Sequence, residues 1–310
     1  MKAAQINKYG SNEVVEINKN APKPAASRGQ ILVEVYAAGV NPIDWKIREG
    51  YIPLKFPVTL GGDFSGVIAD VGEGVLGFKK GLEVYGYGSV LGGGSGSFAE
   101  FVSADVKVMA LKPKKITHVE AGAFPLTGVS AWQALVDHMG LSKGKKILIH
   151  GGAGGIGSIA IQLAKHLGAY VATTVSSKDM QYIKELGADE AIDYKNQSFE
   201  DLLNDYDGVY DTVGGETYVR SLKVLRKGGI IVSMLEQPRP ELMEQYGVKA
   251  IGQLTQVNSE RLSKLAELID QRVTKVHVDK TFPLEQAGEA LSYLQSGHPR
   301  GKVVLKMKEN

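Results

Sequence analysis

The sequence contains no cysteine among its 310 residues. Disulfides, thiolate zinc sites, iron–sulfur clusters and a cysteine nucleophile are therefore excluded. An excess of charge of one sign is also missing, because 36 Lys and Arg residues stand against 34 Asp and Glu residues. Without a strongly basic or acidic surface, we expect no nucleic-acid partner and no membrane partner.

Long apolar runs are absent as well. No stretch approaches the roughly 20 apolar residues that a membrane-spanning helix needs. Residues 1–6 lack the apolar core of a secretory signal peptide. These absences, together with that of cysteine, favour a cytoplasmic protein.

Glycine, in contrast, is abundant, at 38 of 310 residues. The average glycine content of proteins is about 7%, so glycine is enriched in this chain. In residues 1–122, glycines and prolines separate short segments rich in β-branched and aromatic residues. This pattern predicts a mostly β, barrel-like or sandwich-like unit. The expected strands are Gln30–Ala38, Gly66–Val71, Glu83–Tyr87, Ser97–Ser103 and Lys107–Leu111.

From residue 123 to about residue 260 the pattern changes to alternating strands and helices. Such βα units predict a doubly wound parallel sheet, that is, a Rossmann domain in an α/β protein. Residues 261–310 are too few to fold alone, so we expect them to complete the first domain. The expected strands of the middle segment are Lys146–His150, Tyr170–Val175, Gly208–Asp211 and Gly229–Met234, with helices at Ser158–Leu167, Asp179–Leu186 and Glu216–Leu225.

A glycine motif follows the first expected strand of this segment. Glycines in a G-x-G-x-x-G pattern let the backbone turn tightly and approach a pyrophosphate, which the N-terminus of the next helix then binds. The alternative is a tight turn that binds no ligand. The motif predicts a dinucleotide site formed by Gly152, Ala153, Gly154, Gly155, Ile156 and Gly157.

The end of the second expected strand favours NADPH over NADH. An NAD enzyme places Asp or Glu about 20 residues after the motif, to bind the ribose 2′-hydroxyl. Here Ser176 stands nineteen positions after Gly157, and Lys178 follows. Hydroxyls and a cation accept a 2′-phosphate, whereas a carboxylate repels it. The alternative is that Ser176 or Ser177 only caps the next helix, with Asp179 in its first turn, and a capping hydroxyl can also lie close to a ribose phosphate.

Several segments together resemble the medium-chain dehydrogenase/reductase superfamily. The similarity is closest to its zinc-free quinone oxidoreductase (zeta-crystallin-like) branch and the related enone reductases. It implies a GroES-like catalytic domain, formed by residues 1–122 and 261–310, and a Rossmann NADPH-binding domain at 123–260. The segments that carry it are Ala38–Asp44, Gly61–Gly66, Ala121–Leu135, His150–Gly168, Tyr210–Gly214 and Gly301–Leu305.

The resemblance also implies roles for single residues. Thr127 should lie near the phosphate and ribose of the cofactor, and Val213 beside the nicotinamide. Ser176, Lys178 and Tyr194 should surround the 2′-phosphate. Tyr194 has a plain alternative, as a half-buried aromatic residue at the end of a strand.

The chain departs from the zinc-dependent members of the superfamily. Those place Cys near the position of Asn41 and a His-Glu pair near Gly62 and Asp63, and this sequence has neither. None of its six histidines belongs to a pair spaced to bind a metal. We therefore expect no metal site, and we expect Asp63 to hydrogen-bond local backbone or a nearby hydroxyl.

Reduction of a quinone or an α,β-unsaturated carbonyl needs little acid–base machinery, because the conjugated carbonyl is already an electrophile. A hydrogen-bond donor at the carbonyl oxygen would stabilise the charge that builds up there. The candidate catalytic residues are Asn41, Lys46 and Tyr51. Quinone oxidoreductases often carry tyrosine where this chain has Lys46, while relatives that act on enones often carry lysine. Lys46 could instead be a surface lysine on a short helix, and Tyr51 could simply pack.

The sequence thus predicts an NADPH-dependent, zinc-independent oxidoreductase that acts on a small quinone or enone. The alternative is a non-catalytic NADPH-binding protein, of a sensor or RNA-binding type. The family also suggests a homodimer, formed through the exposed edge of the Rossmann sheet around Val248–Leu254.

Overall fold

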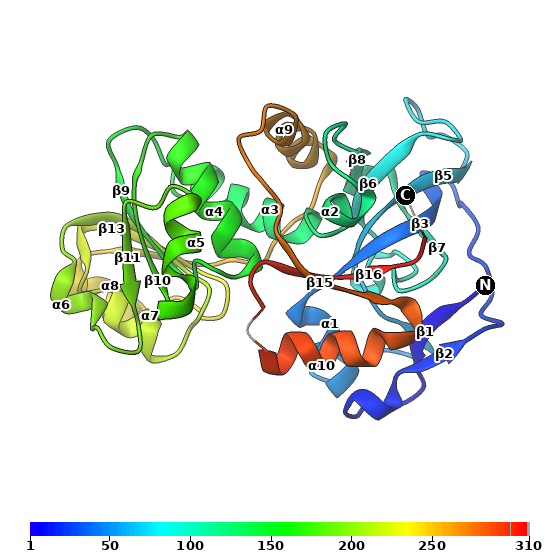
Figure 1. Ribbon diagram of the computed structural model, residues 1–310, viewed down its shortest axis with the longest axis horizontal. Helices are drawn as coiled ribbons and strands as arrows, with labels where there is room; N and C mark the ends of the chain where they lie inside the picture. The colour runs from blue at the N-terminus through cyan, green and yellow to red at the C-terminus, as the bar shows by residue number, and fades with distance from the viewer. Residues whose placement is uncertain (298, 309–310) are drawn as a thin grey trace. The chain divides into compact units, whose positions relative to one another are not determined.

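The computed structural model describes residues 1–297 and 299–308. The chain forms two compact units (Figure 1). The expected boundaries at 122/123 and 260/261 lie four residues from the principal boundaries of these units. Unit 1 comprises Met1–Leu126, Val257–Arg272 and Val276–Asn310, and unit 2 comprises Thr127–Gln256 and Val273–Lys275.

Unit 1 is built mainly from two β-sheets. The smaller has the strand order β2-β1-β4, with β1 at Ala3–Ile6, β2 at Glu16–Asn18 and β4 at Val58–Thr59. The larger has the order β15-β16-β3-β5-β6-β8, and β7 pairs with β3 as well. Its strands are β3 (Gln30–Val40), β5 (Asp63–Val71), β6 (Glu83–Tyr87), β7 (Phe101–Asp105), β8 (Met109–Leu111), β15 (Val278–Pro283) and β16 (Lys302–Lys306).

The C-terminal segment joins this larger sheet. Strand β16 pairs antiparallel with β3, and Val303 lies opposite Val40. Helix α10 packs against β16 and α1. A buried apolar core therefore combines residues from both ends of the chain. The helices of the unit are α1 (Pro42–Glu49), α2 (His118–Gly122), α9 (Ser259–Asp270) and α10 (Ala287–Gly297).

The predicted bounds of two strands in unit 1, Ser97–Ser103 and Lys107–Leu111, were partly wrong. The backbone before β7 is not part of that strand, because Phe98 N–H donates to Leu60 O and Phe98 O accepts from Ala4 N–H. This segment therefore runs alongside β1 and ends at the start of β7. The first half of the strand expected at 107–111 is a 3-10 turn (Val106–Val108), since the Asp105 side chain accepts from Lys107 N–H at 2.8 Å.

Unit 2 contains one six-stranded sheet in which every pair of neighbours is parallel. The order is β11-β10-β9-β12-β13-β14, which is the Rossmann order 3-2-1-4-5-6 when counted from β9. The order reverses between β9 and β12, where ligands of such sheets bind. The strands are β9 (Lys146–His150), β10 (Tyr170–Val175), β11 (Glu190–Asp193), β12 (Tyr206–Asp211), β13 (Leu225–Ser233) and β14 (Lys249–Gly252).

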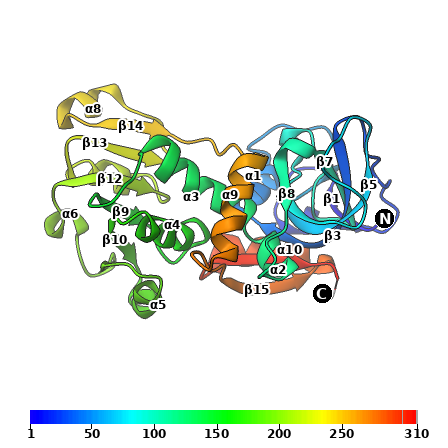
Figure 2. The same ribbon diagram turned by 90° about the horizontal axis from the view of Figure 1, so that it is seen from above.

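Helices pack on this sheet (Figure 2). Helix α4 contacts β9 and β10, α5 contacts β11, and α7 contacts β12 and β13. The helix expected at 216–225 ends at Ser221, because β13 begins at Leu225. Within the described residues no helix has the length and apolar character to cross a membrane. The helices are α3 (Pro125–Trp132, at the unit boundary), α4 (Gly155–His166), α5 (Met180–Glu185), α6 (Phe199–Leu202), α7 (Glu216–Ser221) and α8 (Pro240–Tyr246), and a π-helix at Gln133–His138 follows α3.

Candidate active site

The glycine motif forms the turn between β9 and α4. A Cβ on Gly152 would lie 2.2 Å from Thr173 Oγ1, and one on Gly157 would lie 2.3 Å from Gly151 O. Both positions therefore require glycine. Gly154 is the N-cap of α4 and offers no side chain to cap it. The first amides of this twelve-residue helix are left without a side-chain acceptor, which fits a pyrophosphate.

His150, the last residue of β9, fixes the start of this loop. The Ser221 hydroxyl donates to Thr217 O at 2.6 Å, so Ser221 Oγ must accept from His150 Nε2–H at 2.8 Å. His150 Nδ1 then accepts from the Thr174 hydroxyl at 2.9 Å. Burial lowers the pKa of His150 to about 4, which keeps the imidazole neutral. The hydrogen-bond chain thus links α7, β9 and β10 beneath the glycine loop.

The loop after β12 lies beside the same strand end. Thr212 Oγ1 donates to His150 O at 2.8 Å, and a Cβ on Gly151 would lie 3.8 Å from Val213 Cγ2. Val213 is exposed next to the glycine loop. Thr127 is a buried residue of α3 at the first position of unit 2.

The residues expected around a 2′-phosphate follow two neighbouring strands. Val175 and Asp193 are paired at the ends of β10 and β11, and Tyr194 N–H donates to Val175 O at 3.1 Å. Ser176, Lys178 and Tyr194 therefore lie at one edge of the sheet, with Lys178 and Tyr194 exposed.

Ser176 does not use its hydroxyl as a helix cap. It occupies the N-cap position of a 3-10 turn (Ser177–Asp179), but its Oγ donates to Asp179 Oδ2 at 2.8 Å. The hydroxyl must turn away from Asp179 before it can donate to a phosphate. Tyr194 is 53% exposed and directly follows β11, which agrees with the alternative interpretation of a half-buried aromatic residue at the end of a strand. Its contact with a 2′-phosphate stays a prediction.

In unit 1, Asn41 and Asp44 lie at the start of α1. Asn41 is the N-cap, Pro42 takes the first helical position, and Asp44 Oδ2 accepts from Asn41 N–H at 2.8 Å. Asn41 is 1% exposed. Its side chain therefore points into the unit.

A buried polar cluster surrounds Asn41. Its Nδ2 donates to Asp63 Oδ2 at 2.8 Å, and its Oδ1 accepts from Lys302 Nζ. Lys302 Nζ also donates to Val40 O at 2.9 Å, and Asp63 Oδ1 accepts from Leu126 N–H at 2.8 Å. The antiparallel pairing of β3 and β16 places Lys302 opposite Asn41. A direct contact between Asn41 and a substrate would need this cluster to rearrange.

The interior shifts the pKa values of the charged members. Burial raises the pKa of Asp44 to about 7, and the charge of Asp63 adds to the rise. Burial likewise raises the pKa of Asp63 and lowers that of Lys302, while the attraction between their charges opposes both shifts. The expectation that Asp63 bonds backbone is confirmed by Leu126, but its other partners are an amide and an ammonium rather than a hydroxyl.

Lys46 and Tyr51 are more accessible. Lys46 Nζ lies 5.7 Å from the centroid of the Trp45 ring, and the Tyr51 ring meets the same indole edge-on at 5.9 Å. Tyr51 is 69% exposed. Neither polar tip has a hydrogen-bond partner in the part of the chain that the structure describes.

No group of three or more His, Cys, Asp or Glu side chains is placed to hold a metal ion in residues 1–297 and 299–308. Zinc independence itself stays a prediction.

Sequence reasoning missed two residues of these sites. Lys302 belongs to the Gly301–Leu305 segment that carries the family resemblance, so the signal was present but assigned no role. His150 stands two residues before the glycine motif, and its hydrogen bonds to Thr174 and Ser221, which give it a function, are visible only in the structure.

Comparisons with known proteins cover nearly the whole chain. Residues 27–114 match the alcohol dehydrogenase GroES-like domain family, and residues 186–305 match the zinc-binding dehydrogenase family. The chain is 38% identical to 2-methylene-furan-3-one reductase of Solanum lycopersicum, over 98% of this chain and 79% of that protein. It is 36% identical to the NADPH-dependent alkenal/one oxidoreductase of Arabidopsis thaliana chloroplasts, again over 98% and 79%.

The chain belongs to the medium-chain dehydrogenase/reductase superfamily.

Within this superfamily, the structure resembles that of the quinone oxidoreductase from Coxiella burnetii. The TM-score is 0.92 at 33% identity, over 99% of both chains. These findings confirm the predicted quinone oxidoreductase branch of the superfamily and the predicted fold class, a Rossmann sheet with a GroES-like domain.

Proposed function

We propose that this chain is an NADPH-dependent oxidoreductase that passes a hydride to a quinone or to an α,β-unsaturated carbonyl without zinc. In this proposal unit 2 binds the cofactor and unit 1 supplies the catalytic domain. The names of its relatives support both the cofactor and the two substrate classes.

One observation carries the cofactor assignment. The helix that follows β9 has an N-terminus without a side-chain cap. The residues that follow β10 include Ser176 and Lys178, and no carboxylate among them faces solvent. The amides of α4 bind the pyrophosphate, and Lys178 and Tyr194 bind the 2′-phosphate. Thr127 contacts the phosphate–ribose stretch, and Val213 packs beside the nicotinamide. The nicotinamide supplies the hydride.

The protein's own task in the chemistry is to stabilise charge. Hydride arrival makes the carbonyl oxygen of a conjugated acceptor negative, and a donor at that oxygen stabilises it. Lys46 and Tyr51 are suited to this, because their polar tips have no partner among the described residues. Asn41 acts through position, since its amide anchors the start of α1 to Asp63 and Lys302. Solvent supplies the final proton.

The first experiment measures the consumption of NADPH, and separately of NADH, with a panel of quinones, enones and alkenals, with and without EDTA. We expect turnover with NADPH that survives chelation. Loss of turnover with EDTA would contradict zinc independence. Tight NADPH binding without turnover on any acceptor would favour a non-catalytic NADPH-binding protein.

A charge reversal tests the choice of cofactor. Lys178→Asp is expected to weaken NADPH binding about 10- to 100-fold, the value of a charge-assisted contact, and to leave NADH binding nearly unchanged. Lys184→Asp is the matched control, because Lys184 is an exposed lysine of the same unit within α5. Equal effects of the two variants would contradict the 2′-phosphate assignment.

We also propose a cytoplasmic homodimer. Among the strands of residues 1–297 and 299–308, β14 pairs only with β13 and forms an edge of the Rossmann sheet, which a second copy could extend. Sedimentation equilibrium of the wild type and of an Ala250→Pro variant tests this. Gln253 N–H donates to Ser233 O of β13, so by strand alternation the N–H of Ala250 faces the open edge, and proline there removes an outer donor. A monomeric wild type would contradict the proposal.

A further inference from the structure

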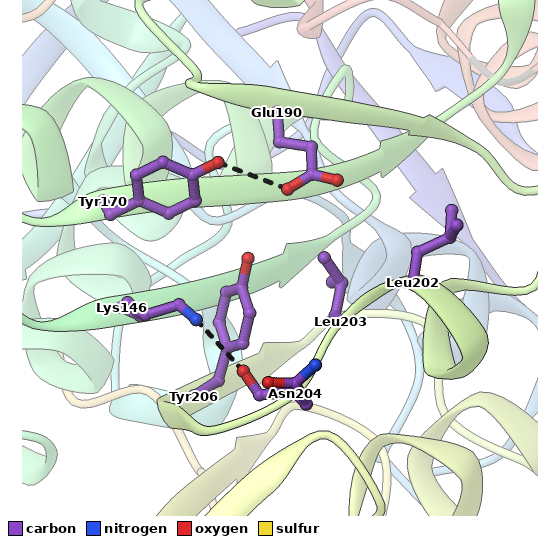
Figure 3. Close-up of a pocket in the computed structure, with 7 residues that line it drawn as sticks. All are labelled: Lys146, Tyr170, Glu190, Leu202, Leu203, Asn204 and Tyr206. Carbon is purple, nitrogen blue, oxygen red and sulfur yellow. Dashed lines mark hydrogen bonds between the residues drawn. The ribbon is translucent and has the colours of Figure 1, made fainter.

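Unit 2 contains a cavity at the edge of the sheet where its strands begin (Figure 3). Its volume is about 360 Å³. Lys146, Tyr170, Glu190 and Tyr206 line it, and each is the first residue of its strand. The end of α6 and the residues after it complete the wall. Because the strands are parallel, the cavity and the glycine loop lie at opposite edges of the sheet, about 13 Å apart at about 3.3 Å per residue.

Tyr206 presents an unused hydrogen-bond donor to this cavity. The residue is 1% exposed, and Lys146 Nζ lies over its ring at 4.5 Å from the centroid. Figure 3 shows the hydroxyl directed toward Tyr170 and Glu190. It has no hydrogen-bond partner in residues 1–297 and 299–308. A ligand oxygen that accepts from this hydroxyl would gain a hydrogen bond of about 0.5–1.5 kcal/mol.

Glu190 supplies an acceptor on the adjacent wall. Its Oε2 accepts from the Tyr170 hydroxyl at 3.3 Å, and its Oε1 has no partner in the described part of the chain. Burial and the charge of Glu190 raise the pKa of Tyr206, so the Tyr206 hydroxyl keeps its proton and remains a donor. The cavity therefore offers one donor and one acceptor to the same occupant.

The charges of the walls select the class of ligand. The Lys146 ammonium, which donates to Asn204 O at 3.0 Å, and the Glu190 carboxylate have opposite signs. Together they give no net charge, so they favour neither an anion nor a cation. The Tyr170 ring and the Leu202 side chain are both partly exposed and form an apolar mouth.

We propose that this cavity binds a small uncharged phenol. The phenol oxygen accepts a hydrogen bond from the Tyr206 hydroxyl, and the phenol O–H donates a hydrogen bond to Glu190. The phenol ring packs against Tyr170 and Leu202. A hydroxyl group fits because one oxygen serves as acceptor and donor at once. The site lies away from the proposed cofactor site, and its occupation requires no turnover.

The test is a titration of the isotopically labelled full chain with 4-methylphenol, followed by amide NMR shifts. We expect saturable shifts confined to residues 146, 170, 190 and 202–206. The ether 4-methylanisole can accept from Tyr206 but cannot donate to Glu190, so it should bind about five- to tenfold more weakly. Shifts confined to residues around Lys46 and Tyr51 would place the phenol in the proposed active site and overturn the cavity assignment.

Two variants make the test specific. Tyr206→Phe removes a hydroxyl that has no hydrogen-bond partner in the described part of the chain, so the fold is retained, while phenol affinity should fall about five- to tenfold. Tyr218→Phe is the matched control, at a tyrosine of the same unit that is 2% exposed and does not line the cavity. Absence of saturable shifts, or equal affinity of Tyr206→Phe and the wild type, would overturn the proposal.

Discussion

The ammonium of Lys302 lies 3.7 Å from the carboxylate of Asp63 inside unit 1, and the two side chains are 6% and 0% exposed. Asn41 joins them, since it donates to Asp63 and accepts from Lys302. Lys302 is the first residue of β16, which pairs antiparallel with β3 in the larger sheet of unit 1. The pair therefore couples the proposed catalytic segment after β3 to the C-terminal strand.

Loss of one partner should be far more costly than loss of both. Lys302→Met leaves Asp63 buried without its counter-charge, and we expect a loss of about 3–5 kcal/mol in the free energy of unfolding. The double variant Lys302→Met/Asp63→Asn should recover part of this loss. Urea unfolding of the single and double variants measures the coupling.

The surface pair of Lys308 and Glu34 provides the control. Both side chains are partly exposed, so Lys308→Met should cost less than about 1 kcal/mol. Simple additivity of the two changes in the Lys302/Asp63 cycle would show that the pair is not coupled.

Asp44 should make stability depend on pH. Its pKa is about 7 in the folded chain, against an ordinary value of 3.8. Between these values the folded state keeps a proton that the unfolded state has released. The contribution of Asp44 to stability is therefore complete below the pKa of the unfolded chain. It is lost as pH rises from that pKa through the pKa of the folded chain, by at most about 1.4 kcal/mol per pH unit.

Asp44→Asn should flatten this dependence between about pH 4 and 7. Asp63, Lys302 and Tyr87 are the other titratable groups that interact with Asp44, and they remain in the variant. Asp70→Asn, at an exposed aspartate of β5, is the control. Urea midpoints across this range measure the slope, and an unchanged slope in Asp44→Asn would contradict the assignment.

His150 should act in the opposite direction at acid pH. Its pKa is lowered from 6.5 to about 4 by burial, so its contribution is complete above the unfolded value and is lost as pH falls through the folded one. His150→Gln should therefore lose less stability than the wild type over that interval. His166→Gln, at an exposed histidine of α4, should behave as the wild type does. Circular dichroism at graded urea concentrations measures both.

Gly157→Ala should damage the glycine loop directly. The added Cβ would lie 2.3 Å from Gly151 O and 2.8 Å from Gly152 Cα, which are backbone atoms that cannot turn aside. We expect a loss of about 1–3 kcal/mol in stability and at least about tenfold weaker NADPH binding. Gly92→Ala, where nothing lies within 4 Å, is the control. Unchanged NADPH affinity in Gly157→Ala would show that the loop does not approach the cofactor.

Much of unit 2 could be predicted because its signals are local. The strands Lys146–His150 and Tyr170–Val175 were predicted with the bounds that the structure has. Both are apolar runs followed by clear turn or helix signals. Strand Glu190–Asp193 was not predicted, because it is short and lies at a sheet edge.

The sequence by itself determined the alternation of strands and helices in the Rossmann domain, the glycine loop and the absence of cysteine ligands, since these depend on residues that are neighbours along the chain. Only the tertiary structure decided that Asn41 contacts Lys302, 261 positions away, and that Tyr206 points into a cavity. Such contacts depend on strand pairing and register, which bring distant residues together. Composition and periodicity do not specify which polar atoms then meet in the interior.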